Sequence, residues 1–496
     1  MKRPRTLFLK PQQAIWITLT VIFILGSWIR LIDIQDPPLD FNPTRQLRSA
    51  IIARGYFYEH TPNPDPDKRD TAMGHKRGME YLEPPVLEMI TSWIYLLAGK
   101  EILWVARVLT SICWVVGGAA LFDLGRRMTS PPAALIGLLY YFFIPFSIRA
   151  SRSFQPDPVM VMLVLLAAWT LYRWSVKPTW KWTIISGLTG GVSAFVKPAG
   201  LLFVGGMVLG LILFKAWHKP SDDQSKPIPI FKNTQGWAIV GLIAAFVIGY
   251  YLVQTGKQST GYFTSWTIIS RWREVLTPSF YVQWLLRIDS IVYLSLVAVG
   301  FIGMLIAAPK NRAMLAGFWA GYIFLGFLFP HHIITHDYYH LPLVGLVSLS
   351  MTPLVEVVIK KILDQQIVFR ILFIGAVLVF FGYTGWIGRS VLVGQDYRDH
   401  PAFWQKVAGA YPEGSKAIGL TQDYGYRLMY YGWRRIDLWP QGERVENFSK
   451  ISGEADYFVI TAKNQLNNEL ENYLEDNYSV HSEGIGYQIF DIRTSK

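Results

Sequence analysis

The sequence predicts a polytopic α-helical membrane protein that ends in a small external α/β domain. Hydrophobic residues make up 51% of the 496-residue chain and charged residues only 17%, whereas soluble domains carry about 25% charged residues. Apolar runs of about 20 residues, the length that spans the hydrocarbon core, recur until about residue 390, where the composition turns polar. These observations together define the fold class.

About eleven apolar runs are expected to form membrane spans. They lie near residues 13–32, 101–124, 131–148, 157–174, 182–196, 199–215, 235–254, 288–308, 312–330, 341–359 and 367–388. The run 182–196 is short and rich in glycine, and it is the weakest of the set. The first run follows a basic N-terminus but lacks a small-x-small cleavage site, so we expect an uncleaved span rather than a signal peptide.

The distribution of basic residues predicts the orientation. With the N-terminus in the cytoplasm, the cytoplasmic segments carry more than twice as many Lys and Arg residues as the short external loops. The apolar stretch 85–98 has only about fourteen residues, which is too short for a straight span. Counting it would place Arg126 and Arg127 outside, so we expect a re-entrant or surface helix. Residues 33–100 then form a long first external loop.

The polar segment 391–496 is expected to fold as a separate external domain behind the transmembrane module 1–390. Strand-like runs occur at 417–421, 457–461 and 487–492, and a helical pattern covers 464–476.

Composition argues against two other classes. The formal charge is +12, but no basic block stands apart from the apolar runs and no nucleic-acid motif is present, so no nucleic-acid partner is expected. Cys113 is the only cysteine, which excludes intrachain disulfides and cysteine-built zinc or iron–sulfur sites.

Ionisable residues at the ends of apolar runs are candidates for chemistry, because such groups are costly at membrane depth. Asp40 follows the Pro-rich turn at Asp36, and a carboxylate held by prolines can act as a general base or can belong to a solvated turn. Glu83 precedes Pro84 and Pro85, where it can orient an acceptor, bind a cation or cap the next helix.

A second pair of candidates flanks the fourth and fifth runs. Asp157 follows Arg149 and Arg152 and stands at the expected N-cap of the fourth run. Capping this helix is also the simplest structural explanation for the aspartate. Lys197 lies alone between two short apolar runs, where it can hold a phosphate or extend toward the membrane surface.

The loop 331–340 contains four histidines and Asp337 within ten residues. Such a loop can bind phosphate, ligate a metal or form an interfacial aromatic segment. No second ligand set is identifiable, so no metal ligands are assigned and a divalent cation is kept only as an option. The Asp65-Pro66-Asp67 triplet has the form found in many nucleotide-sugar enzymes, but its charged flanks favour a solvated loop.

The order of these motifs resembles the GT-C superfamily of membrane glycosyltransferases, in the branch of protein O-mannosyltransferases and lipid A aminoarabinose transferases. The resemblance covers residues 13–390 and rests on the Pro-flanked Asp40, the Pro-Pro segment after Glu83 and the Arg152…Asp157 spacing. Phe41 stands where the mannosyltransferases usually have Glu, and Glu83 stands where relatives carry His or Lys.

The resemblance implies an integral membrane enzyme of a prokaryotic inner membrane. It would transfer a sugar, with inversion, from a polyprenyl-phosphate donor to a hydroxyl of a lipid, glycan or protein acceptor on the external face. The implied catalytic residues are Asp40, Asp157 and Glu83. The implied donor-phosphate residues are Lys197, Arg152, Arg45, His336, Tyr338, Tyr339 and His340. The alternative is a transporter or lipid-linked-sugar flippase, although the internal repeats common in transporters are not evident.

Overall fold

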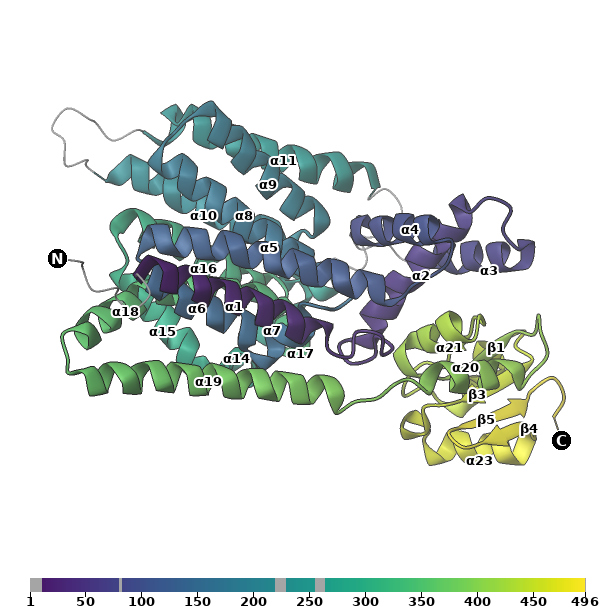
Figure 1. Cartoon of the computed structure of the whole chain (residues 1–496). Coiled ribbons are helices and arrows are strands. Elements are labelled where there is room, and N and C mark those ends of the chain that lie inside the picture. Colours follow the sequence, from purple (N-terminus) through teal and green to yellow (C-terminus); the bar gives the residue numbers. More distant parts are fainter. Residues whose placement is uncertain (1–10, 80–82, 219–228, 255–263, 496) are drawn as a thin grey trace. The chain divides into compact units, whose positions relative to one another are not determined.

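The computed structural model describes residues 11–79, 83–218, 229–254 and 264–495 (Figure 1). The chain divides into two compact units. Unit 1 comprises residues 1–34, 81–86 and 107–394, and unit 2 comprises residues 35–80, 87–106 and 395–496. Much of the long first loop therefore belongs with the C-terminal segment.

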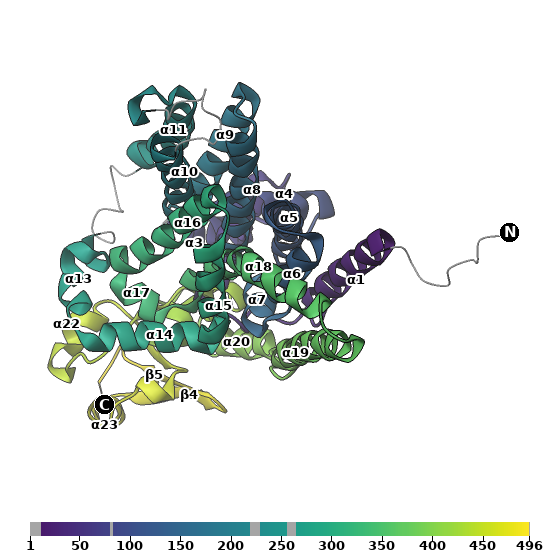
Figure 2. The same cartoon turned by 90° about the vertical axis from the view of Figure 1, so that its left-hand side faces the viewer.

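Unit 1 is an assembly of apolar helices, which confirms the predicted fold class. Its helices are α1 (Pro11–Leu31), α5 (Trp104–Met128), α6 (Pro131–Phe143), α7 (Pro145–Ala150), α8 (Asp157–Val176), α9 (Trp180–Val196), α10 (Ala199–Trp217), α11 (Thr234–Gln254), α13 (Ile268–Val275), α14 (Pro278–Val292), α15 (Leu294–Ile306), α16 (Pro309–Leu328), α17 (Pro330–Thr335), α18 (Leu341–Leu363) and α19 (Ile367–Val393), with a 3₁₀ turn, η2 (Asp337–His340). Helix α9 packs against α8 and α11, and α10 packs against α16 (Figure 2).

Every predicted apolar run lies largely in helix, but two runs are broken. The run 131–148 divides at Pro145, and Ile144 before it is extended, because proline disfavours a helical residue at the preceding position. The run 288–308 contains a 95° bend between α14 and α15 at Tyr293, which has a φ of 61°. Within the described residues, six helices are long and apolar enough to cross a membrane, or seven if this bent pair counts as one span.

Helices α10 and α16 approach closely at glycines, as is common where membrane helices pack. A Cβ atom at Gly317 would lie 2.0 Å from the carbonyl oxygen of Gly206, and one at Gly321 would lie 2.4 Å from the carbonyl oxygen of Leu202. The backbone atoms cannot move aside as a flexible side chain can. The absence of a side chain at these positions therefore sets the distance between the two helices.

Replacing Gly317 with alanine is expected to destabilise unit 1 by about 1–3 kcal/mol, because the added methyl group forces α10 and α16 apart. The measurement is thermal unfolding of the purified protein in detergent. Gly205→Ala is the matched control, since a Cβ there meets nothing within 4 Å and alanine favours helix by about 1 kcal/mol. Equal melting temperatures for the two variants would contradict the close approach.

Unit 2 combines three helices of the first loop with a small α/β fold. The helices are α2 (Pro43–His60), α3 (Pro66–Arg77), α4 (Val86–Ala98), α20 (His400–Gly409), α21 (Tyr426–Tyr431), α22 (Phe448–Ser452) and α23 (Asn468–Asn477). The strands are β1 (Ala417–Leu420), β2 (Asp437–Leu438), β3 (Tyr457–Ile460), β4 (Ser479–Gly484) and β5 (Tyr487–Asp491), in the order β2-β1-β3-β5-β4. Strand β1 is parallel to β2 and β3, whereas β5 is antiparallel to β3 and β4.

The three predicted strands and the predicted helix are confirmed as β1, β3, β5 and α23. Strands β1 and β3 are completely buried, so their apolar runs were easy to recognise. Strand β4 was missed because it is a mostly exposed edge strand of polar residues, and β2 because it has only 2 residues.

A cation from the first loop connects α2 to α21 inside unit 2. The Arg54 guanidinium pairs with Glu101 at 2.9 Å and donates a hydrogen bond to the backbone oxygen of Tyr430 at 2.7 Å. It also lies 3.9 Å from the ring centre of Tyr430 and 4.1 Å from that of Trp433. This arrangement fixes first-loop residues to the C-terminal part of the chain.

Candidate functional site

The centre of the candidate site in unit 1 is a buried ion pair between Lys197 and Asp157. Asp157 is the first residue of α8, and Lys197 directly follows α9, so the packing of these two helices brings the side chains together. The Lys197 Nζ lies 2.6 Å from Asp157 Oδ1, and the side chains are 7% and 2% exposed. Asp157 Oδ2 is buried without a hydrogen-bond partner among the described residues.

An aromatic cluster from the loop after α16 borders this pair. The Lys197 Nζ lies 4.8 Å from the ring centre of Tyr338 and 5.2 Å from that of Tyr339, which is the range of cation–π attraction. The rings of His332 and His336 stack at 4.9 Å, and His332 also contacts Tyr339 and Trp266. The structure therefore groups Lys197 and Asp157 with Tyr338 and Tyr339, and places His336 beside the tyrosines.

His340 belongs to a buried hydrogen-bond chain. Its Nε2 lies 2.7 Å from the backbone oxygen of Ile333, which can only accept, so Nε2 carries the hydrogen. Its Nδ1 then accepts from the Tyr322 hydroxyl at 2.7 Å, and that hydroxyl receives a bond from Trp284 at 3.0 Å. Both ring nitrogens of His340 are thus engaged within the protein.

Arg152 holds the end of α1. It donates to the backbone oxygens of Arg30 at 3.3 Å and Asp33 at 3.1 Å, and also to that of Ile32. Arg30 is itself buried and donates to the Ser151 hydroxyl at 2.7 Å. Carbonyl groups at a helix C-terminus lack intrahelical partners, and Arg152 donates to them at the end of α1. The chain leaves the helix there through Asp33, which has a positive φ of 53°.

Asp40 and Arg45 lie in unit 2, near the start of α2. The turn before Asp40 is buried, and Asp36 Oδ1 accepts a hydrogen bond from the backbone N–H of Tyr397 at 2.9 Å. Asp40 itself is partly exposed, and the Gln46 amide lies 3.5 Å from its Oδ1 while donating to the backbone oxygen of Phe41 at 2.6 Å. Asp40 therefore stands at the partly exposed end of a turn that is held before it by the Asp36–Tyr397 hydrogen bond and after it by the Phe41–Gln46 hydrogen bond.

The remaining candidates are placed as follows. Glu83 is partly buried and belongs to unit 1, and Arg45 is partly buried in the first turn of α2. Asp65 caps α3 by accepting from the backbone N–H groups of Asp67 and Lys68, as expected of a structural loop. Among the residues that the structure describes, no three His, Cys, Asp or Glu side chains are arranged to hold a metal ion.

Sequence reasoning missed two residues of this region, Arg30 and Trp266, and gave a third, Asp337, no specific role. Arg30 was passed over although a cation at the end of an apolar run is costly to bury, which is a usable signal. The Asp337 carboxylate lies 3.7 Å from the Arg149 guanidinium, and this pairing between distant segments is not visible in the sequence. Trp266 joins the cluster through His331 and His332 and gave no signal in the sequence.

Comparison with known proteins agrees with this fold. The family model described as dolichyl-phosphate-mannose-protein mannosyltransferase matches residues 82–227, which include Glu83, Arg152, Asp157 and Lys197. A search of curated proteins gives no match.

Solved structures are similar over nearly the whole chain. ArnT from Cupriavidus metallidurans bound to undecaprenyl phosphate is 13% identical with a TM-score of 0.57, and the match covers 97% of this chain and 98% of that one. The Archaeoglobus fulgidus oligosaccharyltransferase in complex with Zn and sulfate is 13% identical with a TM-score of 0.56, covering 96% and 73%. The archaeal oligosaccharyltransferase AglB from Archaeoglobus fulgidus, in complex with an inhibitory peptide and a dolichol-phosphate, is 13% identical with a TM-score of 0.55, and the match covers 97% of this chain and 74% of that one.

Proposed function

Because the chain has the fold of the GT-C membrane glycosyltransferases, we propose that it transfers a sugar from a polyprenyl-phosphate donor to an acceptor hydroxyl. The reaction takes place at the external face of the membrane and inverts the anomeric centre. The family match over residues 82–227 and the lipid phosphates bound by ArnT and AglB support this assignment.

The observation that carries the proposal is the buried Lys197–Asp157 pair beneath Tyr338 and Tyr339. An ammonium group has three N–H donors, and the bond to Asp157 uses one of them. A phosphate group beside Lys197 accepts the remaining two N–H bonds. Cation–π attraction to the rings of Tyr338 and Tyr339 holds the ammonium group in place. Asp157 then positions Lys197 and limits the cost of burying its charge.

Asp40 is proposed as the general base. The acceptor oxygen forms a bond to the anomeric carbon while its proton passes to the Asp40 carboxylate. The bond between the anomeric carbon and the phosphate oxygen breaks, and its electron pair leaves with polyprenyl phosphate. Because the attack and the departure occur on opposite faces, the configuration inverts. Lys197 stabilises the charge that grows on the leaving phosphate.

The other candidates take supporting roles in this proposal. Arg152 positions the segment that leaves α1, because its described bonds go to backbone carbonyls. His340 positions the aromatic loop through its two ring nitrogens. His336 and Arg45 are proposed to contact the donor phosphate, and Glu83 is proposed to orient the acceptor.

The proposed membrane is a prokaryotic plasma membrane, with the N-terminus in the cytoplasm and residues 391–496 outside. The excess of Lys and Arg in the expected cytoplasmic segments supports this orientation. The polyprenyl tail lies in the bilayer beside the helices, since a chain of this kind is insoluble in water. The donor therefore reaches the site from the membrane, and the acceptor reaches it from the aqueous side.

Reconstituted protein is expected to convert radiolabelled polyprenyl-phosphate sugars to free polyprenyl phosphate and a glycosylated acceptor. A panel of donors and of lipid, glycan and peptide acceptors identifies the substrates, and NMR of the product gives its anomeric configuration. Parallel reactions with EDTA test the divalent cation. Movement of intact donor across the bilayer without any turnover would favour the flippase instead.

A further inference from the structure

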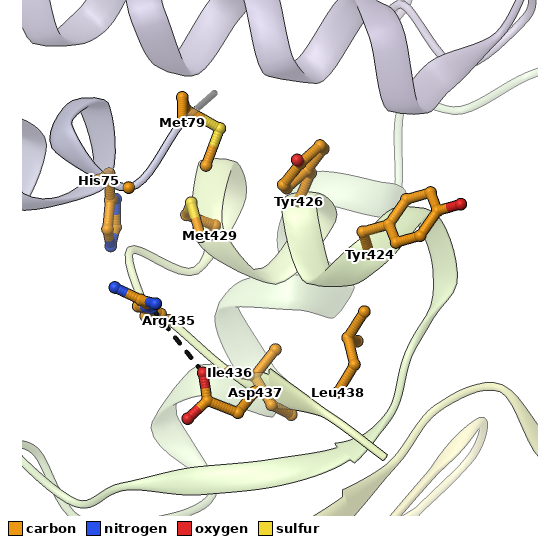
Figure 3. A pocket seen from close by; sticks show the side chains of 10 residues that line it. His75, Met79, Tyr424, Tyr426, Met429, Arg435, Ile436, Asp437 and Leu438 are labelled. Carbon is orange, nitrogen blue, oxygen red and sulfur yellow. Dashed lines mark ion pairs between the residues drawn. The ribbon is translucent and has the colours of Figure 1, made fainter. Parts of the chain in front are cut away.

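Unit 2 contains a pocket between the end of α3 and the C-terminal fold (Figure 3), whereas Lys197 belongs to unit 1. Its volume is about 300 Å³, at the lower end of the range of small-molecule sites. The lining residues are His75, Gly78, Met79, Tyr424, Tyr426, Met429, Arg435, Ile436, Asp437 and Leu438. None of these residues has a role in the proposed transfer reaction.

The lining combines apolar surface with a balanced pair of charges. Figure 3 shows the side chains of Met79 and Met429 close together, with Arg435 near Asp437. The Arg435 Nε lies 3.9 Å from Asp437 Oδ1, and these side chains are 65% and 77% exposed. Both charged groups are therefore accessible to a ligand while carrying no net charge between them.

His75 adds a neutral polar group to this wall. It is 6% exposed, and its Nδ1 has no hydrogen-bond partner among the described residues. Burial, together with the charges of Arg54 and Arg435, lowers the pKa of His75 to about 4, so the ring is uncharged at neutral pH. The uncharged ring therefore adds no net charge to the pocket lining.

The backbone that presents the tyrosines is held in place. Asp423 and Tyr424 have positive φ values of 52° and 57°, a conformation that non-glycine residues seldom adopt. Asp423 accepts from the Thr44 hydroxyl at 2.8 Å and pairs with Arg427. Tyr424 is left 64% exposed as a result. An exposed ring on an anchored loop is suited to contact with a ligand.

We propose that this pocket binds a sugar residue of a neutral saccharide acceptor. Sugar rings offer C–H faces that pack on tyrosine and methionine, and neighbouring hydroxyls that donate to a carboxylate and accept from a guanidinium. A lining without net charge favours such a ligand over a phosphorylated one. The acceptor role rests on the proposed glycosyltransferase function, whereas saccharide binding at this pocket does not.

The test uses the full-length protein in nanodiscs and an array of neutral oligosaccharides, with phosphorylated counterparts for comparison. We expect wild type to bind a subset of the neutral saccharides, and Asp437→Asn and Arg435→Gln each to weaken binding by about tenfold or more, the loss typical of a hydrogen bond to a charged group. Asp396→Asn is the matched control, because Asp396 also pairs with an arginine two residues away on an exposed surface outside the pocket.

Donor hydrolysis to polyprenyl phosphate, measured without acceptor, separates the two proposals. Retained hydrolysis in the pocket variants, with loss of saccharide binding, supports the acceptor site. If wild type binds saccharide but does not turn over the donor, the pocket remains a saccharide-binding site and its acceptor role is overturned. Absence of neutral-saccharide binding, binding of phosphorylated saccharides only, or equal binding by wild type and both pocket variants overturns the pocket assignment.

Discussion

Asp40→Asn is expected to slow glycosyl transfer by about 10²–10⁴-fold, the usual contribution of a general base, while the affinity for donor stays nearly unchanged. Asparagine has the shape of aspartate but cannot take up the acceptor proton. The fixed turn around it persists, because the Gln46 bond to the backbone oxygen of Phe41 does not involve the Asp40 side chain. Single-turnover transfer and equilibrium binding of the polyprenyl-phosphate sugar measure the two quantities separately.

Asp65→Asn is the control for this experiment. Asp65 belongs to the same loop and caps α3 through its side-chain oxygen, and asparagine is an equally good N-cap. We expect this variant to transfer sugar at the wild-type rate. Substantial transfer by Asp40→Asn would remove Asp40 from the role of base, and an equal loss in both variants would indicate a general disturbance of the loop.

The sequence predicted the helical module well because its apolar runs are governed by one physical requirement. A chain that crosses lipid must satisfy its own backbone hydrogen bonds, so each long apolar run becomes helix. The breaks were harder to predict. Pro145 marks one of them, but the 95° bend at Tyr293 follows no proline or glycine and depends on how α14 and α15 pack.

The sequence pointed to individual residues of the candidate site but not to their arrangement. Asp157 and Lys197 were both selected for their cost at membrane depth, yet their 2.6 Å contact depends on the packing of α8 against α9. Likewise, His340 was indistinguishable from His336 in a histidine-rich loop until Tyr322, on a different helix, was seen to engage it. Side chains that meet across helices leave no periodic signal in one sequence.

Sequence patterns also fail to predict the pocket of unit 2, because it unites residues from α3 with residues near β2. Arg54 illustrates the same limit, since it pairs with Glu101 and contacts Tyr430 and Trp433 far along the chain. Its position within a polar loop gave no reason to expect burial. Contacts between distant segments therefore account for most of what the sequence did not predict.

Lys197→Met is expected to destabilise the protein by about 3–5 kcal/mol, because it leaves the buried Asp157 carboxylate without its partner. Thermal or denaturant unfolding in detergent measures this effect. Lys360→Met is the control, since the Lys360 side chain is 72% exposed where it pairs with Glu356, and an ion pair with a solvent-exposed lysine contributes less than about 1 kcal/mol. A loss no larger than that of the control would show that the Lys197–Asp157 pair is unimportant for stability.

The double variant Lys197→Met/Asp157→Leu separates stability from function. Replacing both members of a buried ion pair with apolar residues often restores stability, so we expect unfolding close to that of wild type. Affinity for the polyprenyl-phosphate sugar should nevertheless stay at least about tenfold weaker, because the cation that meets the phosphate is gone. If the double variant regained donor affinity along with stability, the pair would be structural, and the phosphate contact would have to be sought elsewhere in unit 1.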